Sequence, residues 1–453
     1  MRVNSLTMTV LIKILQVVLA LSILILIHET GHFAFAKAFR IRVDKFFLFF
    51  DAGGFKLFST KSRWFTRIFP RAATWETEYG IGWLPLGGYC KISGMIDESM
   101  DTEAMKQPPK EWEFRTKPAW QRLLVMAGGV LFNFIFAILV YICILDIWGS
   151  SYISNKENCI WATPLAEELG FRTGDRILDF DGWEPENFNM LPADLVRRKV
   201  QVVRVLRDAD TVSLYMDASR TGDILSSDGL FDVAVPFVVD TIPPASVNFG
   251  SGFLKGDRII AIEGVPVRFV QDTRAILGKT ISGTLDATVL RGADTLSMTM
   301  KTDSTGHALI YAALPGLTYR QYTFLQAIPA GFKLTFSTIG GYLKDLRMVA
   351  TPSTGAYKSV GSFIAIGQVF PDRWDSRQFA FLLALLSIML GVMNLLPIPG
   401  LDGGHIVFVL FEMITGRKPS DKFMEAAQIV GMLLLFALMM FACGNDITRL
   451  LKH

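Results

Sequence analysis

Four apolar segments of this chain are each long enough to cross a lipid bilayer. A transmembrane helix needs about 20 predominantly apolar residues, because each residue adds about 1.5 Å along the helix axis. The segments cover residues 8–39, 118–148, 379–415 and 423–445, and the third is interrupted by Pro397 and Pro399. With 51% apolar residues overall, the chain is predicted to be a polytopic α-helical membrane protein with four transmembrane helices.

The first segment also has features of a signal peptide. Arg2 and Lys13 precede its apolar core, and Ala34-Phe35-Ala36 imitates a cleavage site. However, the polar sequence HETGH at residues 28–32 lies between that core and that site, where a signal peptide gains nothing. We therefore interpret residues 1–39 as a retained transmembrane helix.

The regions between the segments differ in charge. Residues 40–117 hold thirteen Lys and Arg, and the short link 416–422 is also basic. The positive-inside rule then places both regions in the cytoplasm, and both termini and residues 149–378 outside it. We expect a cytoplasmic, membrane-associated β-hairpin region at 40–117 and an amphipathic, interfacial segment at 319–378. The net charge of +3 implies no nucleic-acid partner.

The outer region contains an internal repeat with an offset of 82 residues. GFRTGDRI at residues 170–177 recurs as GFLKGDRI at residues 252–259, among short β-rich runs. A repeat of this length predicts two extracytoplasmic α+β domains, at residues 149–231 and 232–318. The motif is typical of PDZ domains, which bind extended peptides by strand addition; the alternative is a generic pair of β domains. The motif residues are Gly174, Asp175, Gly256 and Asp257.

HETGH has the HExxH pattern of a catalytic zinc site. On a helix, His28 and His32 lie on one face, and Glu29 between them is placed to act as general base. A bare HExxH also occurs by chance, and a buried histidine is usually a satisfied core residue. In an apolar span that alternative loses weight, because ionisable residues in membranes are costly and functional by default.

Asp402, in NLLPIPGLDGGH, is the best candidate for a third ligand. The prolines and glycines around it break the helix, and non-helical backbone at membrane depth requires protein or a wet cavity around it. One span separates the first from the third, so these two run in the same direction and HETGH and LDGG are expected at similar depth. His405 is a competing ligand that we interpret as supporting or structural. Glu412 and Glu425, near span ends, are expected to be solvated.

Taken together, these motifs resemble the site-2 protease family of intramembrane zinc metalloproteases, of the RseP type (regulator of sigma-E protease) with tandem PDZ domains. HETGH matches the family's HExxH, and Asn394 to Gly403 match its NxxPxxxLDG motif. GIGWLPLGGY at residues 80–89 resembles its PLGGY stretch. The resemblance covers nearly the whole chain.

The resemblance implies a protease of the bacterial inner (cytoplasmic) membrane that cuts single-pass membrane proteins within or beside their spans. His28, His32 and Asp402 would bind Zn²⁺, with Glu29 as base and Asn394 holding the substrate. Anti-sigma factors and remnant signal peptides are typical substrates. Such enzymes act second, after a site-1 protease, in regulated intramembrane proteolysis during envelope stress signalling.

The sequence departs from the family in its cytoplasmic and second-span regions. AGGVLFNF replaces a GPxxN pattern, so that Gly129 stands at the proline position while Asn133 is retained, and the loop that ends at Trp75 is long. Residues 79–92 are a candidate clamp that pairs with an unwound substrate, or else a purely structural hairpin. The substrate-contacting residues proposed there are Gly82, Pro85, Gly87 and Gly88.

Two other functions compete with the protease. A membrane scaffold would bind peptide ends through its PDZ pair and hold zinc structurally, but structural zinc is usually closed by four ligands. A metal transporter would need polar residues along a path through the spans, whereas the polar residues here form one cluster at one depth.

Overall fold

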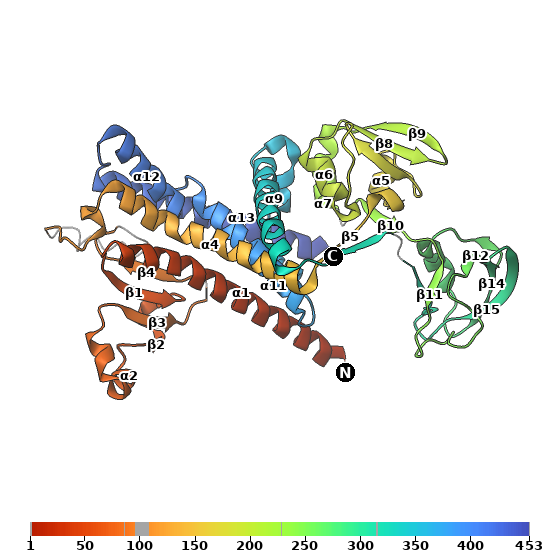
Figure 1. Ribbon diagram of the computed structural model, residues 1–453, viewed down its shortest axis with the longest axis horizontal. Coiled ribbons are helices and arrows are strands. Elements are labelled where there is room, and N and C mark those ends of the chain that lie inside the picture. Colours follow the sequence, from red (N-terminus) through yellow and green to blue (C-terminus); the bar gives the residue numbers. More distant parts are fainter. Residues whose placement is uncertain (1, 86, 96–107, 228, 314–315, 453) are drawn as a thin grey trace. The chain divides into compact units, whose positions relative to one another are not determined.

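The computed structural model describes all residues except 1, 86, 96–107, 228, 314–315 and 453. Within these residues the chain forms two compact units (Figure 1). The first unit comprises residues 1–149, 321–347 and 360–453, and the second comprises residues 150–320 and 348–359.

The first unit contains the four helices that are long and apolar enough to span a membrane. The predicted third segment is two helices, because the backbone leaves the helix between residues 396 and 401, and only the first of the two qualifies as a span. The spanning helices are α1 (Arg2–Ala38), α4 (Ala119–Trp148), α11 (Ser376–Leu395) and α13 (Asp421–Lys452). The unit also contains α9 (Phe324–Val349), the short helix α10 (Phe363–Val369) and α12 (Asp402–Thr415).

Helix α4 lies at the centre of this unit and packs against α1, α11 and α12. Its sequence AGGVLFNF places two adjacent glycines on the side that faces α1. A Cβ atom on Gly31 of α1 would overlap the backbone of Gly128 and Gly129 on α4. Small residues therefore bring the two helix backbones into direct contact, as is common inside membranes.

Residues 43–92 form a four-stranded sheet instead of the predicted hairpin. The strand order is β2-β3-β1-β4, with β1 parallel to β3 and antiparallel to β4. The hairpin prediction failed because β1, from an earlier part of the chain, lies between β3 and β4. The strands are β1 (Val43–Leu48), β2 (Lys56–Ser59), β3 (Glu78–Gly82) and β4 (Tyr89–Ile92), and a short helix, α2 (Arg63–Ile68), follows β2.

The second unit has two separate hydrophobic cores, one for each copy of the sequence repeat. The predicted boundary after residue 231 falls inside strand β10 (Phe231–Ala234), which pairs with β6 (Cys159–Ala162) of the first copy. Each copy has a main antiparallel sheet. The first uses β7 (Arg176–Phe180), β8 (Val202–Arg207) and β9 (Asp210–Tyr215), and the second β12 (Arg258–Ile262), β13 (Val265–Pro266), β14 (Thr284–Arg291) and β15 (Asp294–Lys301).

Shorter elements complete the second unit. The strands are β5 (Ser150–Ile153), which pairs with β17 (Leu317–Arg320), and β11 (Val239–Thr241), which pairs with β16 (Tyr311–Ala312). The helices are α5 (Pro164–Glu168), α6 (Leu191–Arg197), α7 (Thr221–Ser226) and α8 (Arg274–Leu277).

The repeated GD motif builds the same polar network in both copies. Buried Asp175 accepts two hydrogen bonds from Arg207, and Asp257 accepts two from Arg291. Each arginine also donates to the carbonyl of the glycine that opens the motif, at 2.8 and 2.9 Å. Gly174 and Gly256 precede the aspartates with φ of 98° and 94°, a region that favours glycine. The motif residues therefore stabilise each fold.

Hydrogen bonds from Arg291 hold the pKa of Asp257 below its usual value. The pairing therefore stabilises the fold above the ordinary carboxyl pKa, and this contribution is lost as the pH falls through the folded-state pKa. Replacing Arg291 by Ala leaves a buried carboxylate without its cation, and we expect a loss of about 3 kcal/mol in local stability. Hydrogen exchange of β12 and β14 at pH 7 measures this. Replacing the exposed Arg258 by Ala is the control, and this variant should exchange its β12 and β14 amides at nearly the wild-type rate.

Candidate metal centre

Three side chains converge on one point between the helices of the first unit. His28 and His32 lie one turn apart on α1, and Asp402 is the first residue of α12. The two Nε2 atoms are 3.3 Å apart, and Asp402 Oδ2 lies 3.2 Å from that of His28 and 3.3 Å from that of His32. Both histidines are at most 8% exposed. The structure thus brings together the three residues predicted as ligands.

The separation of these atoms fits a tetrahedral zinc ion. Bonds of about 2.0–2.1 Å in tetrahedral geometry place neighbouring ligand atoms about 3.3–3.4 Å apart. Two imidazole nitrogens and one carboxylate oxygen are also a ligand set that catalytic zinc uses, with a fourth position open. The residues present therefore fit zinc in both geometry and chemistry.

Each imidazole is oriented by a partner on α4. His32 Nδ1 lies 2.8 Å from the carbonyl oxygen of Val125. Because a carbonyl only accepts, Nδ1 must carry the proton, which leaves Nε2 free to bind a metal. Buried Asn133 lies 3.1 Å from His28 Nδ1, and its amide oxygen, turned to this position, would accept the Nδ1 proton in the same way.

Glycines make room for this arrangement. A Cβ atom on Gly129 would lie 2.5 Å from His32 Nε2 and 2.6 Å from His28 Cε1. Gly403 and Gly404 similarly lie against the backbone of residues 395–399, where the chain turns before Asp402. The turn itself contains Gly400 with φ of 97°. These close approaches leave no space for side chains.

A cavity of about 480 Å³ opens onto the three ligands. Glu29 and Asn394 line it, together with Tyr89, Cys90 and Lys91 of strand β4. The Glu29 carboxylate interacts with the backbone N–H of Cys90, and the Asn394 amide nitrogen lies 3.2 Å from His28 Nε2. The base candidate, the ligands and the edge strand of the sheet therefore share one space.

The four substrate-contacting residues predicted in the PLGGY region lie in different places. Gly88 lines the cavity, where a Cβ would meet Ile25 of α1. Gly82 is inside β3 against the backbone of Phe50, and Gly87 packs against the Phe50 ring. Pro85 is half-buried in the connection between β3 and β4 and does not line the cavity. Packing thus accounts for the absence of a side chain at all three glycines.

Two features of the site were not anticipated. The sequence marks Asn133 only as a retained family position, because its contact with His28 arises from the packing of α1 on α4. Glu412 was expected to be solvated, but it accepts a hydrogen bond of 2.5 Å from the buried guanidinium of Arg122, which ties α12 to α4. His405 lines the cavity and does not belong to the ligand group.

Comparison with known proteins gives consistent matches over nearly the whole chain. The sequence model of peptidase family M50 matches residues 16–438. The regulator of sigma-E protease RseP of Escherichia coli (strain K12) is 28% identical over 96% of this chain and 98% of its own length. The metalloprotease MmpA of Caulobacter vibrioides is 25% identical over 97% of this chain and 96% of its own length. A protein of Xylella fastidiosa (strain 9a5c) is 25% identical over 95% of this chain and 97% of its own length. Its name includes the words zinc metalloprotease.

Replacing Gly129 by Ala should weaken metal binding, because the added methyl group displaces both imidazoles. We expect the affinity for Zn²⁺ to fall about 10–100-fold, the range seen when the surroundings of metal ligands are disturbed. Competition with a chelator on the purified full chain measures this. Gly340→Ala, in open space on α9, is the control. An unchanged affinity in Gly129→Ala would show that the histidines do not hold the metal in this geometry.

Proposed function

The chain belongs to peptidase family M50, and on this premise we propose that it is an intramembrane zinc endopeptidase that cleaves transmembrane segments of single-pass membrane proteins. The observation that carries the proposal is the convergence of His28, His32 and Asp402 in a cavity that also contains Glu29. The cavity lies beside α1, a helix apolar enough to span a membrane. A substrate held in the same bilayer reaches it directly.

We further propose that its substrates resemble anti-sigma factors and remnant signal peptides. The relatives named regulator of sigma-E protease support the anti-sigma-factor part of this proposal. The cut would be the second of two, after a site-1 protease has shortened the substrate, and would serve envelope stress signalling. The enzyme would lie in the bacterial inner membrane, with its termini and the two repeats, as PDZ domains, outside the cytoplasm.

Each residue at the site would have a separate role in the reaction. Bound zinc supplies Lewis acidity for the attack of water on a peptide carbonyl. His28, His32 and Asp402 would hold it, and Glu29 would take the proton of the attacking water and pass it to the departing amine. Asn394, beside His28 Nε2, is placed to donate to the carbonyl oxygen of the substrate.

Strand β4 is the element best placed to hold an unwound substrate. A transmembrane helix hides its peptide bonds, so it must become extended before hydrolysis. β4 is an edge strand and lines the cavity, while β3 lies inside the sheet. An extended segment that pairs with β4 would pass beside Glu29, which already interacts with the Cys90 N–H. This narrows the clamp predicted at residues 79–92 to residues 89–92.

Glu29→Gln should abolish cleavage without loss of metal, because the amide cannot accept a proton. We expect the rate on a reconstituted single-span substrate to fall by at least about 100-fold, with zinc content unchanged. Asp402→Asn, in contrast, should lose zinc as measured by metal analysis. Cleavage by Glu29→Gln at the wild-type rate would exclude Glu29 as the base.

Substrate pairing with β4 can be tested by photo-crosslinking in the Glu29→Gln background. Benzoylphenylalanine in place of Lys91, on the edge that faces the cavity, should capture a single-span substrate. The same group in place of Lys56, on the opposite edge strand β2, is the matched control. Equal capture at both positions would contradict pairing along β4.

A further inference from the structure

The long segment between β2 and β3 has a composition unlike the rest of the sheet. Residues 61–75, KSRWFTRIFPRAATW, contain four cations and no acidic residue. They form the short helix α2 and a following turn of 3-10 helix, Pro70–Thr74. The protease chemistry proposed above makes no use of this segment, which we name the basic finger.

The basic finger exposes large apolar side chains together with its cations. Trp64 is 55% exposed, Ile68 62% and Phe69 55%. Within the part of the chain that the structure describes, none of the four cationic side chains forms an ion pair: Lys61, Arg63, Arg67 and Arg71. A surface of this kind, both apolar and cationic, suits a partner that is apolar inside and anionic at its face.

The basic finger lies at the level where the first spanning helix ends. Its last residue, Trp75, packs edge-on against Tyr79, which in turn contacts Phe33 of α1. The next residue, Glu76, pairs with Lys37 at 2.6 Å, one residue before α1 ends at Ala38. Figure 1 shows α2 at the edge of the sheet farthest from α1, at the same end of the unit as the C-terminal end of α1. Trp and basic side chains at such a level are typical of the membrane–water interface.

From these observations we propose that the basic finger docks on the anionic lipid headgroups of the leaflet at which α1 ends. Trp64, Ile68 and Phe69 would enter the interface, while the arginines would contact lipid phosphates. A soluble acidic protein would satisfy the arginines but would not account for three large apolar side chains at the end of a span. The inference depends on the membrane helices and not on the proposed protease chemistry.

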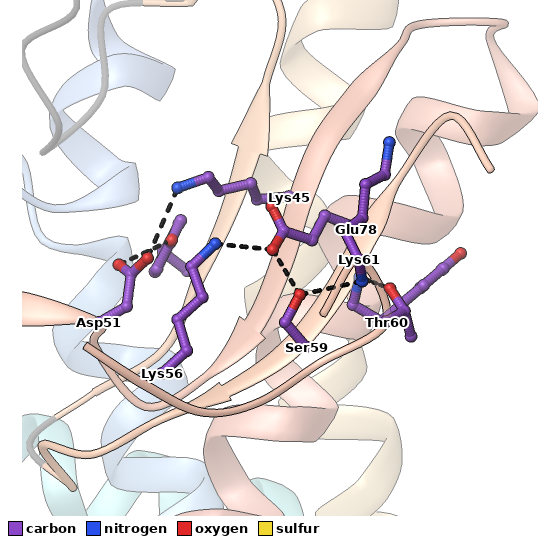
Figure 2. Close-up of polar contacts among 9 residues, drawn as sticks. Lys45, Asp51, Lys56, Ser59, Thr60, Lys61 and Glu78 are labelled. Carbon is purple, nitrogen blue, oxygen red and sulfur yellow. Dashed lines mark hydrogen bonds and ion pairs between the residues drawn. The ribbon is translucent and has the colours of Figure 1, made fainter. Parts of the chain in front are cut away.

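The basic finger packs against the sheet, so docking would also hold the sheet in position. Phe58 of β2 packs against both Trp64 and Phe65 of α2, with ring centroids 5.8 and 5.3 Å apart. Figure 2 shows the polar part of this joint, in which Ser59 accepts from the Lys61 N–H and donates to Glu78 of β3. A lipid contact at α2 is thus transmitted to β3, and through β1 to the edge strand β4.

Hydrogen exchange of the full chain in lipid nanodiscs tests the proposal. In phosphatidylcholine discs that contain phosphatidylglycerol, amides of residues 61–75 should exchange roughly tenfold or more slowly than in phosphatidylcholine alone, since each arginine contributes about a factor of five near an anionic surface. The triple variant Arg63→Gln, Arg67→Gln, Arg71→Gln should lose this difference. A variant with the same charge change at exposed sites of the second unit, Arg172→Gln, Arg274→Gln, Lys279→Gln, should keep it.

Two results would overturn the proposal. One is equal exchange of residues 61–75 in both lipid compositions with the wild-type chain. The other is protection of the same residues by an oligoglutamate peptide in detergent without any effect of phosphatidylglycerol, which would assign the segment to an acidic protein partner. Zinc content and Glu29-dependent cleavage, measured in phosphatidylcholine, separate a failure here from a failure of the proposed protease function.

Discussion

The backbone contact between α1 and α4 at Gly31, Gly128 and Gly129 is the constraint on which the site depends. Without side chains at these positions the two helices approach closely enough for α4 to supply a carbonyl to His32 and an amide to His28. Each histidine then presents Nε2 to the same point. A bulkier residue at any of the three glycines would separate the helices or enter the space of the imidazoles, so the HExxH pattern needs this partner helix as much as its own spacing.

The contact between α1 and α4 also offsets the free-energy cost of placing polar groups in an apolar span. Two imidazoles and two carboxylates are expensive there unless each has a partner. The ligands face one another, Glu29 interacts with the Cys90 N–H, and α4 orients both rings. Ser387 of α11 donates to the Asn133 carbonyl, and Arg122 holds Glu412 of α12. Helix α4 therefore orients both histidines and is also bonded to α11 and α12, and the ligand Asp402 is held by packing on the helix that orients the histidines.

The sequence predicted those parts of the fold that local patterns determine. Four spans, the break before Asp402 and the two copies of the GD motif could each be read from apolar length, prolines or repetition. Strand order could not, because β1 enters between β3 and β4 through pairing between distant segments, and no local pattern records it. For the same reason Asn133 and Arg122 were not assigned, since their partners lie 105 and 290 residues away along the chain. His28, His32 and Asp402 were predicted because spacing and helix breaks are local signals.

Depth in the bilayer connects the site to the sheet. The proposed zinc ligands on α1 have a fixed depth because α1 is a spanning helix. Under the proposed function, an extended substrate would have to be presented at that same depth to be cut. Strand β4 meets this condition only if the sheet does not tilt away from α1. Three contacts with α1 oppose such a tilt: Phe33 packs against Phe46 and Tyr79, and Lys37 pairs with Glu76. Among the described residues, α1 packs against β1 and β4, whereas β2, at the far edge of the sheet, packs against β3. A lipid contact through the basic finger would support that side, so the bilayer that contains the substrate would also hold the strand that receives it.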